Sequence, residues 1–275
     1  MTKLTLTPVQ ADELTSRTKA TWMAGDFGRI AKSYEPGAAD FITRLHLSVN
    51  TEVLDVACGS GNLTIPAART GAYVTGIDIA SNLVEQAQAW ARIEGLTVAI
   101  DEGDAEQMPY DNDSFDTVVT MFGAMFVPRP DAVAAEMVRV CRRGGRIAMA
   151  NWTPDGFIGH MFKIVGKHVP PAAGVPSPLL WGKPEIVAQR LGDEIAELRC
   201  TQQTITFNFP FSPAATVEYF RTYYGPTLRA FGALRADAQE ALRSELVQLW
   251  AQHNKSGNGV TQVDSTYLEV IAVRK

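Results

Sequence analysis

Residues 53–62 read Val53-Leu54-Asp55-Val56-Ala57-Cys58-Gly59-Ser60-Gly61-Asn62, and this stretch decides the fold. Its first four residues are mostly apolar and predict a buried strand that runs into a glycine-rich turn. Gly59 and Gly61 can take positive φ and carry no Cβ, so a ligand can approach the backbone closely. Asn62 is typical of a helix N-cap and predicts a helix over residues 63–69. The stretch therefore predicts a strand–loop–helix unit that binds a nucleotide-type ligand.

The residues around this loop indicate which nucleotide it binds. A dinucleotide fingerprint carries a third glycine, in the order G-x-G-x-x-G, but that position here is Thr64. Asp55 would repel a pyrophosphate, whereas its carboxylate suits a ligand with an ammonium group. Asp78 ends the next predicted strand, where it can accept hydrogen bonds from both hydroxyls of a ribose. A cationic amino-acid end and a free ribose together describe S-adenosylmethionine.

Five motifs resemble those of class I S-adenosylmethionine-dependent methyltransferases, the broad group that includes ubiquinone/menaquinone-type and many other small-molecule methyltransferases. In chain order they are residues 55–61, 76–79, 103–110, 115–119 and 138–147. Five ordered signals are far more specific than one glycine loop. The resemblance implies an α/β fold with a Rossmann-like, seven-stranded, mostly parallel sheet. It also implies an antiparallel last strand, helices on both faces, and a helical insertion before that strand.

The sequence predicts a single methyltransferase domain over residues 1–275. Its parts are an N-terminal helical cover (1–50), a cofactor-binding core (51–152), and a substrate-side cover with the sheet edge (153–275). The last part contains a helical insertion at 213–254. Alternation with helices predicts strands near 52–57, 73–78, 96–101, 115–121 and 145–152. A helix over 131–142 is predicted to stop at Gly144-Gly145, and later strands are expected over 195–209 and 267–273.

Bulk properties exclude several classes of protein. Hydrophobic residues make up 46% and charged residues 20% of the chain, as in ordinary globular proteins. The net charge of −5 argues against a nucleic-acid binder. The three cysteines lack metal-ligand spacing, so neither a metal site nor a disulfide framework is predicted. With no signal segment and no span-length apolar run, we expect a cytoplasmic protein without a membrane partner. Both a monomer and a homodimer remain open.

The resemblance also implies which residues bind S-adenosylmethionine. Asp104 would accept a hydrogen bond from the adenine amino group, and the amide of Ala105 would reach a ring nitrogen. Ile79 and Leu83 would pack on the adenine, and Tyr34 would contact the methionine end. The full predicted set is Tyr34, Asp55, Ala57, Gly59, Gly61, Asp78, Ile79, Leu83, Gly103, Asp104, Ala105, Met121, Phe122 and Ala124.

No catalytic base stands out in the sequence. Related proteins often carry polar residues or histidine just after the fourth strand, where this chain has Ala124-Met125-Phe126. This departure indicates an apolar acceptor. His160, His168 and Tyr223 are the candidates for a base, since a base must reach the proton that it removes. The predicted function is O- or C-methylation of a small, aromatic or lipophilic acceptor, with S-adenosylhomocysteine as the other product.

Three other functions stay open at this point. A non-catalytic S-adenosylmethionine-binding protein would need only the cofactor site. An aminopropyl-type transferase could use the same scaffold, although such enzymes resemble a pattern richer in acidic residues beside the fourth strand. A nicotinamide dehydrogenase is opposed by Thr64 and Asp55. For methyl transfer, we expect the uncharged, proline-rich residues 168–182 and the aromatic residues 219–224 to form an apolar cover over the acceptor.

Overall fold

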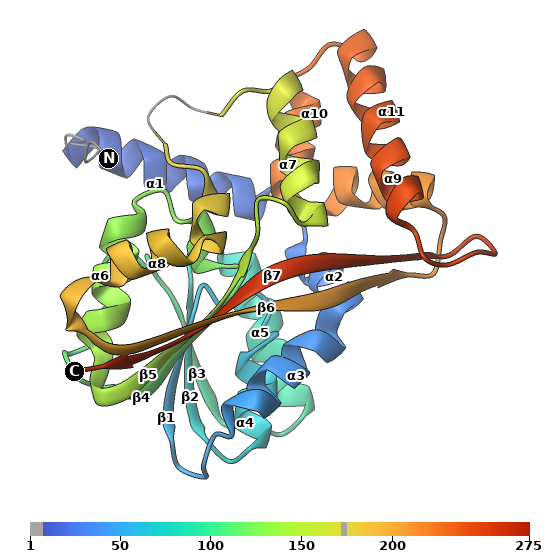
Figure 1. The fold of residues 1–275 in the computed structure, drawn as a ribbon. Coiled ribbons are helices and arrows are strands. Elements are labelled where there is room, and N and C mark those ends of the chain that lie inside the picture. The colour runs from blue at the N-terminus through green and yellow to red at the C-terminus, as the bar shows by residue number, and fades with distance from the viewer. Residues whose placement is uncertain (1–7, 172–174) are drawn as a thin grey trace.

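A computed structural model describes residues 8–171 and 175–275. Within these residues, seven strands form one sheet in the order β3-β2-β1-β4-β5-β7-β6 (Figure 1). Strand β7 runs antiparallel to both neighbours, and the other neighbouring pairs are parallel. The strands are β1 Glu52–Val56, β2 Tyr73–Asp78, β3 Val98–Glu102, β4 Phe115–Met121, β5 Cys141–Trp152, β6 Ile195–Phe209 and β7 Thr261–Arg274. The predicted sheet, with its antiparallel last strand, is confirmed.

Helices cover both faces of the sheet and one of its ends. In Figure 1, α3–α5 lie on one face and α6 and α8 on the other, while α1, α7 and α9–α11 lie over the carboxyl ends of the parallel strands. The helices are α1 Pro8–Met23, α2 Phe27–Ala31, α3 Glu35–Leu45, α4 Thr64–Arg69, α5 Ser81–Ile93, α6 Pro130–Val140, α7 Phe157–His168, α8 Pro184–Leu191, α9 Pro213–Tyr223, α10 Gly225–Gly232 and α11 Ala236–His253. Short 3₁₀ turns are η1 Lys32–Tyr34, η2 Ala124–Phe126, η3 Pro178–Gly182 and η4 Gly192–Glu194.

The strand order reverses between β1 and β4, which lie side by side in the middle of the sheet. From β1 the chain moves outward through β2 to β3, and it then crosses back to β4 and continues to β5. The connections after β1 and β4 therefore leave the sheet in opposite directions. In open α/β sheets this divergence creates a crevice at the carboxyl ends of the strands, where ligands bind.

Several predicted boundaries are wrong: β7 begins at Thr261 rather than at residue 267, and two other differences have local reasons. Helix α6 ends at Val140, two residues early, because residues 141–145 already belong to β5. The register between β4 and β5 is irregular at this point, and Gly144 supplies a positive φ of 74° within the strand rather than a helix cap. Asn62 does not cap α4, which begins at Thr64; its amide instead donates to the carbonyl of Ala31 at 3.2 Å.

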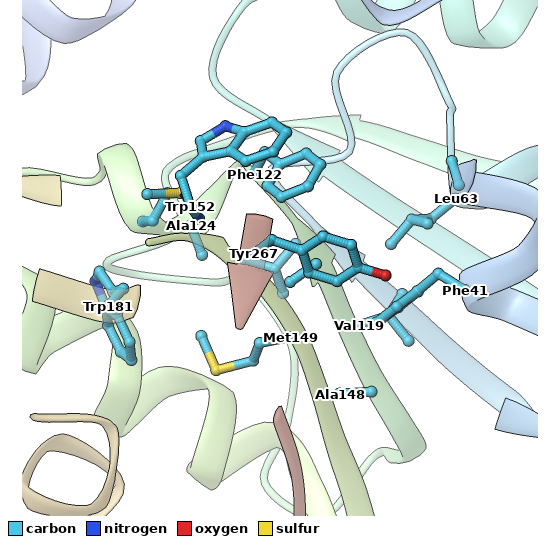
Figure 2. Close-up of a cluster of buried hydrophobic side chains, with 14 of the residues drawn as sticks. Phe41, Leu63, Val119, Phe122, Ala124, Ala148, Met149, Trp152, Trp181 and Tyr267 are labelled. Atoms are coloured by element: carbon cyan, nitrogen blue, oxygen red, sulfur yellow. Dashed lines mark hydrogen bonds between the residues drawn. The ribbon is translucent and has the colours of Figure 1, made fainter. Parts of the chain in front are cut away.

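A buried aromatic cluster fixes the ends of β4 and β5. Phe122 follows β4 and stacks on Trp152 of β5, with ring centroids 3.5 Å apart (Figure 2). Tyr267 of β7 meets the edge of the Phe122 ring at 5.6 Å. Phe122 also has a φ of +55°, a conformation that costs a residue with a Cβ about 1–2 kcal/mol. Packing therefore holds this strained position at the point where the sheet meets the crevice.

Candidate active site

A cavity opens at the carboxyl ends of the first four strands, and its space of about 890 Å³ includes open solvent at the mouth. Its walls come from the loops that follow β1, β2, β3 and β4, together with α1, α2 and η1. All but two of the predicted cofactor-binding residues line it. They are Tyr34, Asp55, Ala57, Gly59, Asp78, Ile79, Leu83, Gly103, Asp104, Ala105, Met121 and Phe122. Sequence motifs spread over ninety residues therefore meet at one crevice.

The other two predicted residues lie behind the cavity wall. Gly61 is buried, with a φ of +95°, and a Cβ there would lie 3.3 Å from the Cβ of Ala87 on α5. Ala124 is fully buried, and its backbone N–H donates to the hydroxyl of Thr120 at 3.0 Å. Both residues shape the loops that carry the wall without lining the cavity themselves.

Asp78 is held by the backbone of two loops. One carboxylate oxygen accepts from the N–H of Gly59 at 2.8 Å and the other from the N–H of Ala80 at 2.8 Å. Burial raises the pKa of Asp78, and these backbone hydrogen bonds act in the opposite direction. A carboxylate has about four lone-pair sites, so acceptor capacity remains for a ligand in the cavity. Asp78 can thus order the glycine loop and bind a ligand at the same time.

Asp55 is a second carboxylate in the cavity, and its partner is the residue that replaces the third glycine of a dinucleotide loop. The hydroxyl of Thr64 donates to Asp55 at 2.7 Å. Burial raises the pKa of Asp55 to about 7, although the Thr64 hydrogen bonds lower it, and the nearby charge of Asp78 adds to the increase. Near neutral pH, this carboxyl group can therefore exchange its proton in response to a charged ligand.

Helix α1 belongs to the predicted N-terminal helical cover, but its residues were not predicted to line the cavity. Its residues Thr15, Thr18 and Trp22 line the cavity. The hydroxyl of Thr15 points at Asp104 across 3.4 Å, and one oxygen of Asp104 accepts from the N–H of Glu106 at 2.9 Å. The signal that could have revealed this wall is Trp22, a large aromatic residue at the end of a mostly polar helix.

The connections after β1 and β4 touch at the base of the cavity. Ala57 has a φ of +55°, and Gly123 lies against it. A Cβ on Gly123 would stand 2.5 Å from the carbonyl oxygen of Ala57 and 2.7 Å from its Cβ. Real Cβ atoms do not approach backbone atoms so closely, so this contact requires glycine.

We expect Gly123→Ala to destabilise the protein by about 1–3 kcal/mol, because the added methyl group pushes the two loops apart. The matched control is Gly166→Ala within α7, where an added Cβ meets nothing within 4 Å. That substitution should stabilise the protein by about 0.5–1 kcal/mol through helix propensity. Urea unfolding of both variants measures the two changes. Equal effects of the two substitutions would show that the Ala57–Gly123 contact is not tight.

A second, smaller cavity adjoins the first; its space of about 310 Å³ includes open solvent, and apolar and aromatic side chains line it. The two cavities share Phe27, Tyr34, Phe122 and Phe126 as common walls. The remaining lining residues are Ile30, Trp152, Ile158, Met161, Phe207, Phe220 and Tyr224. In the part of the chain that the structure describes, no histidine and no charged side chain lines this second cavity.

The three candidate bases from the sequence lie outside both cavities. His160 faces His253, with ring centroids 6.1 Å apart. His168 pairs with Glu245 at 2.8 Å. The ring of Tyr223 lies under the guanidinium group of Arg29, 4.7 Å from its centroid. None of the three lines either cavity.

The expected apolar cover is formed only in part. Phe220 and Tyr224 line the second cavity, but Tyr219 and Tyr223 do not. The described part of residues 168–182 lines neither cavity. One reason is that Trp181 is fully buried and η3 packs on β5. Residues 172–174 of this segment lie outside the described residues.

Across residues 8–171 and 175–275, no group of three or more histidine, cysteine or acidic residues is placed to hold a metal ion. In the same residues, no helix has both the length and the apolar character needed to span a membrane.

Comparison with known proteins identifies a methyltransferase domain at residues 54–149. The uncharacterized protein Rv1405c of Mycobacterium tuberculosis is 36% identical over 256 residues, which is 91% of this chain and 93% of that protein. Methyltransferase GfsG of Streptomyces halstedii is 39% identical over 125 residues, 44% of this chain and 45% of that protein. The full-length similarity thus extends well beyond the matched domain.

Among solved structures, the fold resembles phosphoethanolamine N-methyltransferase 2 of Haemonchus contortus. The alignment covers 87% of this chain and 52% of that chain, with a TM-score of 0.54 and 17% sequence identity. That structure was solved in complex with phosphomonomethylethanolamine and S-adenosylhomocysteine. At 17% sequence identity, this similarity shows a shared fold only.

Proposed function

The chain belongs to the class I S-adenosylmethionine-dependent methyltransferases, and from that premise we propose that it methylates a small, aromatic or lipophilic acceptor. S-adenosylmethionine supplies an electrophilic methyl group on a positively charged sulfur. The observation that supports this acceptor class is the aromatic cavity beside the larger one, with four side chains common to both. A protein that only bound the cofactor would not need that second cavity.

The larger cavity fits the cofactor by its chemistry. Its carboxylates, Asp55, Asp78 and Asp104, suit a ligand with two positive charges and a ribose. We assign the ribose hydroxyls to Asp78, the adenine to Asp104 with Ala105, and the methionine end to Asp55. A positive φ of 54° at Gly59 leaves the loop backbone open to close approach. The remaining cavity-lining residues predicted from the sequence complete the proposed site.

The protein contributes chiefly position and exclusion of water. The described lining of the second cavity holds no group that could act as a general base at neutral pH. Holding two reactants in a near-attack geometry can account for a large part of a rate enhancement. Aromatic walls that the two cavities share, such as Phe27 and Phe126, would keep water from the reacting atoms.

Incubation with S-adenosylmethionine that carries a labelled methyl group tests the proposed function. The acceptors form a mixed panel of phenols, enolisable ketones and aliphatic amines, and products are followed by mass spectrometry. We expect labelled methyl ethers or C-methyl products from lipophilic ring compounds, in step with release of S-adenosylhomocysteine. Transfer to polar amines alone would contradict the proposed acceptor class.

Cofactor affinity should depend on pH through Asp55. Its pKa is about 7 in the free protein, and a cationic ligand stabilises the carboxylate and lowers that pKa on binding. Binding therefore releases a proton below pH 7, so affinity rises as pH increases toward about 7 and then levels off. Calorimetric titration across this range measures how the affinity changes with pH. The variant Asp55→Asn should bind the cofactor more weakly at pH 8, and its affinity should no longer depend on pH in this range. A pH dependence that survives in the variant would show that another group causes it.

A further inference from the structure

Two tyrosine hydroxyl groups stand out in the second cavity. Tyr34 of η1 and Tyr224 at the junction of α9 and α10 both line it, and only 3% and 5% of their surfaces are exposed. Their rings pack tightly: Tyr34 meets Phe122 and Phe207 edge-on, and Tyr224 meets Phe220. Within the described residues neither hydroxyl has a hydrogen-bond partner, and neither oxygen is among the fully buried side-chain atoms that lack one, so both hydroxyl groups keep some exposure and can take a partner from a ligand.

Both hydroxyl groups are held in the protonated form. Burial raises the pKa of Tyr224 far above the usual range, and the neighbouring Tyr34 raises it further. Burial likewise raises the pKa of Tyr34. Both groups therefore keep their protons at neutral pH, which makes them hydrogen-bond donors and rules out a tyrosinate base at this site.

We propose that Tyr34 and Tyr224 form a donor pair that binds the ionised oxygen of the acceptor, which makes the acceptor class acidic hydroxyl compounds such as phenols and enols. This inference rests on the proposed function. Apart from the indole of Trp152, the two tyrosines are the only side chains with an N–H or O–H group among the described lining of this aromatic and aliphatic cavity. An aromatic ring that bears one anionic oxygen matches that arrangement in both shape and polarity.

The pair also explains how the site can work without a base. A phenol or enol that binds as its anion has already released its proton to solvent, so no protein group needs to remove it. Tyr34 borders both cavities, which places one donor beside the position assigned to the cationic end of the cofactor. A protonated amine is disfavoured, because no carboxylate lines the second cavity in the described chain and a positive sulfur would lie next to it.

4-Nitrophenol is a suitable probe, because its phenol and phenolate forms have different absorption spectra. The protein is first saturated with sinefungin, a stable cationic analogue of the cofactor, and 4-nitrophenol is then titrated at several pH values. We expect the bound probe to ionise at a pH at least about one unit lower than the free probe. Tyr224→Phe should weaken phenolate binding about tenfold or more. Tyr34→Phe should have a similar effect on the probe.

The control variant is Tyr219→Phe. Tyr219 lies on α9 next to Phe220, which lines the second cavity, but Tyr219 itself lines neither cavity. This substitution should leave the binding of the probe unchanged. Circular dichroism and sinefungin affinity confirm that each variant is folded. The proposed donor pair is contradicted if sinefungin binds but the probe binds as the neutral phenol. It is also contradicted if sinefungin binds and the probe binds Tyr224→Phe as tightly as the unchanged protein. Tighter binding of 4-nitrobenzylamine than of 4-nitrophenol would also overturn it. Failure of sinefungin to bind would instead contradict the proposed function itself.

Discussion

Asp78→Asn is expected to weaken the binding of S-adenosylhomocysteine at least about tenfold, since a hydrogen bond to a charged group contributes about 1.5–3 kcal/mol. The substitution removes the charge that we assign to the ribose. It also places an amide N–H₂ against one of the two backbone N–H groups, of Gly59 or Ala80, that now donate to the carboxylate. Calorimetric titration gives the affinity, and thermal unfolding separates this loss from a loss of stability.

The matched control for Asp78 is Glu102→Gln. Glu102 lies opposite Asp78 in the register of β2 and β3, yet it is exposed and does not line the cavity. Its ion pair with Lys19 is on the surface, where such pairs contribute little. The control should retain nearly full affinity. Equal losses of affinity in the two variants would mean that Asp78 contributes only its negative charge and makes no specific contact with the ligand.

Phe122→Ala is expected to reduce the free energy of unfolding by about 3–5 kcal/mol, the range for removing a large buried aromatic side chain. Phe122 is 3% exposed and contacts the rings of Trp152, Tyr34 and Tyr267. Its removal would also merge the two cavities, because it lines both. Acceptor turnover should therefore fall even in variant protein that remains folded. Urea unfolding gives the stability change.

Phe126→Ala provides the comparison for this prediction. Phe126 also lines both cavities, but it is only half-buried and packs at the cavity edge against Trp22 and Phe162. Its loss should cost less stability than the loss of Phe122. A smaller effect for Phe122→Ala than for Phe126→Ala would show that the stacked cluster is not what fixes the end of β4.

The sequence predicted the parts of the fold that local patterns determine. The bounds of β2, β4 and β6 agree with prediction, because apolar residues recur along each strand between polar or glycine-containing turns. The glycine loop after β1 and the acidic residue that ends β2 follow from the same local signals. These motifs converge because parallel strands end at one edge of a sheet.

The features that sequence could not predict depend on contacts between distant segments. Ala57 and Phe122 take positive φ, which is unusual for such residues and arises from packing where β1 and β4 end. The second cavity joins residues from η1, β5, β6 and α9, far apart in the chain. The hydrogen bonds of Asp78 to the backbone of Gly59 and Ala80 also join distant segments, and they predict that Asp78→Asn loses stability as well as affinity.

Calorimetric titration of the purified protein with S-adenosylmethionine tests the central claim most directly. We predict binding at one site per chain in the absence of added metal, competition by S-adenosylhomocysteine, and at least about tenfold weaker binding by Asp78→Asn. NAD should not compete, because Thr64 replaces the third glycine and Asp55 opposes a pyrophosphate. No binding of S-adenosylmethionine, or displacement of it by NAD, would contradict the assignment of this cavity.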